Sequence, residues 1–143
     1  MESTMQKPAL VAAVTKLNVN TVLYWIVTAL FCLEMGFTAW YMLAVLPAGA
    51  QAITRLGFPP YFRIELTLAK FVGVVVLLAP VPARLKEWAY AGFAINLASA
   101  LIAHLSMGDG PDALAPSAIT SVLWALSYFF WLGNPAKLNT IPR

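Results

Sequence analysis

Four long apolar runs, separated by short segments rich in proline, glycine and charge, dominate the chain. They cover residues 22–46, 61–79, 86–107 and 116–132. Each run approaches the ~20 residues that a helix needs to cross a ~30 Å hydrocarbon layer. A backbone in lipid must form all its hydrogen bonds within the protein, and a helix does so within a single segment. The pattern therefore predicts an all-α fold, an antiparallel bundle of four transmembrane helices.

The segments between the runs define the organisation. Because the connections are short, consecutive helices should be antiparallel neighbours. Pro116 is suited to the first turn of the last helix. The first run is much longer than the ~7–15-residue core of a signal peptide, so we interpret it as a retained span. We divide the chain into a polar N-terminal segment (1–20), a membrane domain (21–133) and a C-terminal tail (134–143).

The composition agrees with a membrane protein. Hydrophobic residues make up 61% of the 143 positions and charged residues only 10%, whereas soluble domains carry about 25% charged residues. The net charge of +3 is spread over few residues, so nucleic-acid binding is not expected. One cysteine, Cys32, and one histidine, His104, argue against a zinc, iron–sulfur or bis-histidine haem site made by the protein alone. No metal site is predicted, and no cofactor is certain.

The lysines and arginines predict the orientation. Cytoplasmic loops of membrane proteins carry an excess of these residues. Segments that must share one side hold six of them and the other side holds two, namely Lys7, Lys16, Arg84, Lys86, Lys137 and Arg143 against Arg55 and Arg63. Both termini are therefore expected in the cytoplasm of a multi-pass protein, with the bacterial cytoplasmic membrane as its location.

Polar residues inside the apolar runs are the main functional signal. Glu34 is the only charge in the first run, and a carboxylate there costs roughly 2.5–3.5 kcal/mol on insertion scales. With a rise of ~1.5 Å per residue, Glu34, Lys70 and Asn96 fall within about 14–18 Å of the outer helix ends. Glu65 and His104 fall nearer the outer surface. The sequence thus predicts a polar interior that opens toward the outer face.

Two interpretations of these residues remain open. Glu34 and Lys70 form a structural ion pair, or they belong to a site in which Glu34 moves a proton while Lys70 and His104 stabilise negative charge. In the second interpretation these three are the candidate catalytic residues. Asn96 and Glu65 are candidate ligand-binding residues; the alternatives are hydrogen bonding between helices for Asn96 and pairing with Arg63 for Glu65.

Aromatic side chains on the first and last runs are further candidates. They could line a cavity for a flat lipophilic ligand, and the alternative is ordinary packing. These candidate ligand-binding residues are Trp40, Tyr41, Trp124 and Tyr128.

Three segments carry a family resemblance. They are LGFPPYF at Leu56–Phe62, ARLKEWAYAGF at Ala83–Phe93 and HLSMGD at His104–Asp109. In this order and spacing they resemble the DoxX-like family of small four-helix membrane proteins, and the resemblance extends over about 24–132. It implies a four-helix bundle. The family takes its name from a subunit of a quinone-reducing thiosulfate oxidoreductase, and related proteins include chaperone-like members. It implies no agreed catalytic residue.

Three functions follow as alternatives. The first is binding of a quinone-like or isoprenoid-like molecule in a polar cavity, with quinone as the cofactor and an oxidoreductase subunit as partner. The second is a membrane enzyme that performs metal-free acid–base chemistry on a lipophilic substrate, as an isomerase, cyclase or epoxide-opening hydrolase. The third is a structural or chaperone-like membrane partner. Whether the chain is an enzyme stays open. Membrane lipid and a further copy of the chain are the other expected partners.

Overall fold

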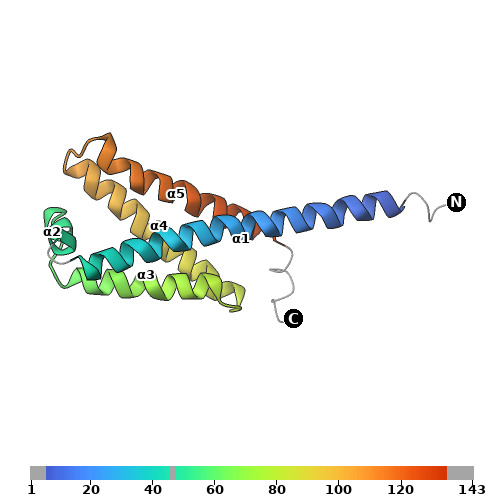
Figure 1. Cartoon of the computed structure of the whole chain (residues 1–143), viewed down its shortest axis with the longest axis horizontal. Coiled ribbons are helices and arrows are strands. Elements are labelled where there is room, and N and C mark those ends of the chain that lie inside the picture. The colour runs from blue at the N-terminus through green and yellow to red at the C-terminus, as the bar shows by residue number, and fades with distance from the viewer. Residues whose placement is uncertain (1–5, 46–47, 135–143) are drawn as a thin grey trace.

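The chain folds into helices joined by short connections (Figure 1). The structure is a computed structural model that describes residues 6–45 and 48–134. Within these two ranges there is no β-strand. The helices are α1 (Gln6–Ala44), α2 (Ala48–Arg55), α3 (Phe62–Leu78), α4 (Ala83–Ser106) and α5 (Pro111–Leu132).

The four longer helices form a closed ring. α1 packs against α3 and α5, and α4 packs against the same two helices from the other side. Consecutive helices of this ring run in opposite directions (Figure 1). Short α2 lies at the end of the bundle where α1 ends and α3 begins, and it contacts both. This arrangement leaves two helix pairs, α1 with α3 and α4 with α5, facing each other across the centre.

Three helices are long and apolar enough to cross a membrane. These segments are Val19–Ala44, Ala83–Ser106 and Pro111–Leu132. The run at 61–79 becomes α3, which has only 17 residues, or about 25 Å of helix, and it contains Arg63, Glu65 and Lys70. The structure therefore gives three candidate spans where the sequence predicted four.

Two element boundaries differ from the sequence-based expectation. Residues 48–55 were expected to be a loop but form α2. α5 begins at Pro111, and Pro116 lies inside the helix. Pro111 occupies the first turn, where no partner is needed for the missing N–H, so it takes the role that the sequence suggested for Pro116.

The two terminal segments have different outcomes. α1 is continuous from Gln6, so most of the polar segment 1–20 is helical and extends beyond the bundle (Figure 1). Residues 1–5 and 135–143 lie outside the described residues, and with them Lys137, Arg143 and nearly all of the predicted tail.

Many large apolar side chains point away from the bundle. Examples on α1, α4 and α5 are Leu33, Phe37, Ile102, Ile119 and Phe129, all well exposed. A soluble monomer rarely exposes contiguous apolar surface of this extent. Lipid is the natural solvent for these faces.

One half of the bundle is tightly packed. Its core consists of side chains from α1, α3, α4 and α5 that are almost completely buried, among them Phe31, Leu77, Tyr90 and Trp131. Ser127 Oγ lies 2.7 Å from both Thr28 Oγ1 and Tyr90 Oη, so hydroxyl groups join α1, α4 and α5 within this core. We call this region the packed half, and the region toward α2 the cavity half.

Candidate functional site

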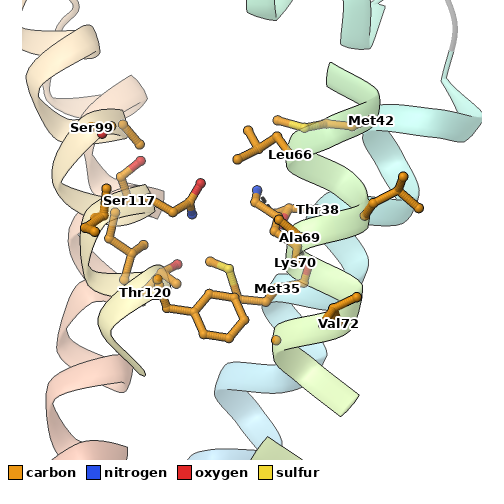
Figure 2. A pocket seen from close by; sticks show the side chains of 18 of the residues that line it. Met35, Thr38, Met42, Leu66, Ala69, Lys70, Val72, Ser99, Ser117 and Thr120 are labelled. Atoms are coloured by element: carbon orange, nitrogen blue, oxygen red, sulfur yellow. Dashed lines mark hydrogen bonds between the residues drawn. The ribbon is translucent and has the colours of Figure 1, made fainter. Parts of the chain in front are cut away.

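A cavity of about 820 Å³ lies between the two helix pairs in the cavity half. Figure 2 shows Met35, Thr38 and Lys70 on one side of it and Ser99, Ser117 and Thr120 on the other. Its walls are mainly aliphatic and aromatic, with few polar groups. A concave, mostly apolar space with a small number of convergent polar groups is typical of sites for small molecules.

The floor of the cavity is the boundary with the packed half. Phe31 and Phe93 meet edge to face with ring centroids 5.0 Å apart, and Phe93 also lines the cavity. A Cβ atom at Gly73 would lie 2.7 Å from two atoms of the Phe93 ring. Gly73 therefore lets α3 and α4 approach closely, and the phenylalanine ring separates the polar groups from the buried core of the packed half. Along α3 and α4 the lining continues past this ring to Val76 and Trp88.

Lys70 is the central polar group. It belongs to α3, is only 7% exposed, and its Nζ lies 3.4 Å from Thr38 Oγ1 on α1 (Figure 2). The distance marks a weak hydrogen bond in which the ammonium donates. Burying a cation is costly unless strong acceptors surround it, and here one hydroxyl is the hydrogen-bond acceptor within the described part of the chain. The ammonium retains donors for another acceptor.

Glu34 lines the same cavity, yet it does not pair with Lys70. The ion pairs among residues 6–45 and 48–134 are Arg55–Asp109 and, when the imidazole is protonated, His104–Asp109. Glu34 Oε2 is buried without a hydrogen-bond partner in those same ranges. A direct structural ion pair between Glu34 and Lys70, one of the two interpretations of the sequence, is therefore absent here.

The opposite wall offers Asn96 on α4 and hydroxyl groups on α5. The Thr120 hydroxyl donates to the carbonyl of Pro116 at 2.8 Å, so its proton is used within its own helix. The half-buried Asn96 amide makes no side-chain hydrogen bond to any described residue. The groups available to a ligand thus include the Lys70 ammonium, the Glu34 carboxyl group and the Asn96 amide. The hydroxyl groups of Ser99 and Ser117 line the same space.

A polar chain crosses the end of the cavity near α2. Arg55 at the end of α2 pairs with Asp109 in the turn between α4 and α5. The second carboxylate oxygen of Asp109 lies 2.7 Å from His104 Nδ1, and His104 lines the cavity. Gly108 makes this turn with a φ of 67°, a conformation that glycine adopts without strain. The Arg55–Asp109–His104 chain therefore ties α2 to α4 across the mouth between the helix pairs.

A family model describes most of the chain. It is the model of the DoxX-like family, and it matches residues 26–126. The chain belongs to the DoxX-like family. The match runs from the candidate span of α1 into α5, so it includes all the walls of the cavity. No curated protein and no solved structure matches the chain. Together with the apolar helices, the DoxX-like match identifies a membrane protein in contact with lipid.

The segments by which the sequence resembles the DoxX-like family surround the cavity. Leu56, Phe58 and Phe62 of the first segment line it beside α2. Phe93 of the second segment forms the floor. His104 and Asp109 of the third supply the polar chain at the mouth. The segments are thus far apart in sequence but lie around one space.

The predicted site residues separate into two groups. Glu34, Lys70, Asn96 and His104 all line the cavity. The remaining five lie outside its lining: Glu65, Trp40, Tyr41, Trp124 and Tyr128. Glu65, Trp40 and Tyr41 are exposed.

The other two aromatic candidates have structural contacts in the packed half. Trp124 donates its indole N–H to the carbonyl of Tyr90 at 3.0 Å and stacks on Tyr128 with centroids 5.8 Å apart. This is the ordinary packing that the sequence offered as the alternative. Both rings pack against Tyr90 on α4, and neither lines the cavity.

Sequence reasoning missed Thr38, the acceptor for Lys70. A helical signal was present, because Thr38 follows Glu34 by four residues and so lies on the same face of α1. Phe93 and Gly73 were also missed as a contact pair, since no pattern in one sequence shows which glycine on one helix faces a ring on another.

Proposed function

We propose that this DoxX-like protein binds a lipophilic small molecule with a quinone-like or isoprenoid-like structure in its cavity. The observation that carries the proposal is the pairing of an apolar 820 Å³ space with a buried Lys70 ammonium that has few acceptors. Ligand sites of about 300–1,000 Å³ accommodate drug-sized molecules. Lys70 and Asn96 would donate hydrogen bonds to the carbonyl or hydroxyl oxygens of the ligand head.

The proposal includes a topology. α3 would be a short fourth crossing whose polar residues face the cavity or the membrane surface, and the six-to-two distribution of lysine and arginine would place both termini in the cytoplasm. If the ligand is a quinone, electrons would come from an oxidoreductase partner subunit, and the present chain would hold and orient the quinone head.

A second candidate is acid–base catalysis on a bound lipophilic substrate. It is favoured by one observation, the buried and unpartnered Glu34 Oε2. A carboxyl group in an apolar site is suited to donate or accept a proton. In this candidate Glu34 transfers the proton, while Lys70 stabilises negative charge that develops on a substrate oxygen.

Lys70→Met tests the proposal. The variant keeps the length of the side chain and removes a buried charge, so the fold should be retained. We expect the affinity for menadione, a naphthoquinone head without a tail, to fall tenfold or more in lipid nanodiscs, measured by calorimetry. Lys86→Met is the matched control, because Lys86 Nζ binds the carbonyl of Leu77 at 2.9 Å and lies outside the cavity lining.

Equal menadione binding by wild type and Lys70→Met would overturn the proposed head contact. A separate experiment tests the catalytic candidate. Solvent extracts of cells that express wild type or Glu34→Gln are compared by mass spectrometry. A lipophilic compound that is consumed by wild type and accumulates with Glu34→Gln supports the catalytic candidate. Identical extracts reject it while leaving ligand binding intact.

A further inference from the structure

The residues that line the cavity differ in their exposure between its two sides. On the side of α1 and α5, its lining includes Met35 and Thr120, which are 3% and 2% exposed. On the side of α3 and α4, large residues line the cavity and face outward at once. Val72 is 63%, Trp88 79% and Ile95 70% exposed. The space therefore continues to the surface of the bundle between α3 and α4.

Small residues keep this gap open. Ala69 on α3, and Gly92 and Ser99 on α4, line the cavity and are exposed. A Cβ atom added at Gly92 would meet nothing within 4 Å. α3 and α4 are joined by a short connection in the packed half and diverge toward α2 (Figure 1). Gly73 and Phe93 make a close contact between the two helices. The gap is lined on both sides of this contact, by Ile95 and Ser99 toward the polar groups and by Trp88 and Gly92 toward the joined end.

We infer that this gap is a lateral portal through which the apolar tail of the ligand passes from the cavity into the lipid. The inference rests on the proposed function and narrows its ligand class. The ligand would be an amphiphile with a compact, hydrogen-bond-accepting head at Lys70 and a tail too long for the cavity. The portal is defined by Leu68 and Val72 on α3 and by Trp88, Gly92 and Ile95 on α4.

Two observations favour the membrane over water as the source of this ligand. First, the side chains that define the portal are apolar, and they lie on faces exposed where lipid surrounds the helices. Second, the other approach, near α2, is crossed by the Arg55–Asp109–His104 chain. A molecule that partitions into lipid would reach Lys70 without passing the charged end.

Gly92→Leu tests the portal. The new side chain enters open space, and leucine favours a helix more than glycine does, so the variant should fold. Gly36→Leu is the matched control, because Gly36 is also a helical glycine whose Cβ would meet nothing within 4 Å and it does not line the cavity. Both variants and wild type are placed in phosphatidylcholine nanodiscs. The probes are menadione and phylloquinone, which carries the same head with a long phytyl tail.

Relative to wild type, we expect Gly92→Leu to lose at least tenfold more affinity for phylloquinone than for menadione, while Gly36→Leu keeps both affinities. Equal phylloquinone binding by Gly92→Leu and wild type would overturn the portal but leave the proposed function standing. No binding of either probe to wild type would reject both. A change of oligomeric state in Gly92→Leu, seen by light scattering, with unchanged phylloquinone binding would identify the gap as a contact between copies and also overturn the portal.

Discussion

The two halves of the bundle use the same four helices in opposite ways. In the packed half, Phe31 and Tyr90 are almost fully buried, and the hydroxyl groups of Thr28, Ser127 and Tyr90 satisfy one another. In the cavity half, Lys70 has a single weak partner and Glu34 Oε2 has none among the described residues. The packed half joins these three hydroxyl groups to one another, with Tyr24 Oη as its exception among the described residues. The cavity half holds the charged groups that have few partners.

This difference places the tightest packing and the buried charged groups at opposite ends of the bundle. A buried polar group without a partner costs free energy. The bundle bears that cost at Tyr24 Oη in the packed half and at Glu34 Oε2 beyond the Phe31–Phe93 floor, where the buried Lys70 ammonium also lies. The packed half supplies the compensating contacts.

Phe31→Ala should have the largest effect on this contrast. Removing a fully buried phenylalanine that contacts Phe93 should lower the free energy of unfolding by about 3–5 kcal/mol. Leu66→Ala, at a half-buried position in the cavity wall, should cost about 1 kcal/mol because the site already borders empty space. Denaturant unfolding in mild detergent, followed by circular dichroism, measures both. Equal losses would show that the two halves are packed alike.

Gly73→Ala should have an intermediate effect at the boundary between the halves. The added Cβ would lie 2.7 Å from the Phe93 ring, which is held in the buried core, so the helices must separate or the ring must move. Overpacking of this kind costs about 1–3 kcal/mol. Gly92→Ala places the same methyl group in open space and should be neutral or stabilise by up to ~1 kcal/mol.

Thermal unfolding of the two alanine variants side by side tests this boundary. If Gly73→Ala and Gly92→Ala have the same unfolding temperature, the contact between Gly73 and Phe93 is not closely packed. The boundary between the two halves would then not lie at this contact.

Arg55→Ala should have the smallest effect on stability. Arg55 is well exposed, and exposed ion pairs contribute about 0–1 kcal/mol. The opening of α2 should be affected more than the free energy of unfolding of the whole bundle, because Arg55 links α2 to Asp109. Hydrogen exchange should become faster in α2 and stay unchanged in the packed half. Arg84→Ala, an exposed arginine at the opposite end of the bundle, is the control, and unchanged exchange in α2 would show that the polar chain does not hold it.

The hydrophobic pattern predicted the helices well because lipid imposes it on every turn. It identified the all-helical fold and the three candidate spans, with differences of a few residues at Ala83 and Pro111. It failed at α2, because an eight-residue helix between glycines and prolines has too few turns for its hydrophobic pattern to be distinguished from that of a loop. It also counted α3 as a full span, although its length and charges set it apart.

Depth along the helices was the useful signal for the candidate site. Counting residues from the helix ends gave Glu34, Lys70 and Asn96 a common level, and all three line one cavity. Depth says nothing about rotation around a helix axis, which is why it could not separate His104, which lines the cavity, from Glu65, which was placed at the same level but is exposed. Partners on neighbouring helices, such as Thr38 for Lys70, depend on the angle at which helices pack, and one sequence does not contain that angle.

Continuous α1 has a consequence for how this protein can be observed. The helix begins at Gln6, whereas its candidate span begins at Val19, which leaves about 20 Å of helix before the span at ~1.5 Å per residue. A fluorophore or spin label attached near Gln6 would sit on a helical extension that is continuous with the bundle. Small rotations of α1 against its neighbours would then be magnified into displacements large enough to follow in a single molecule.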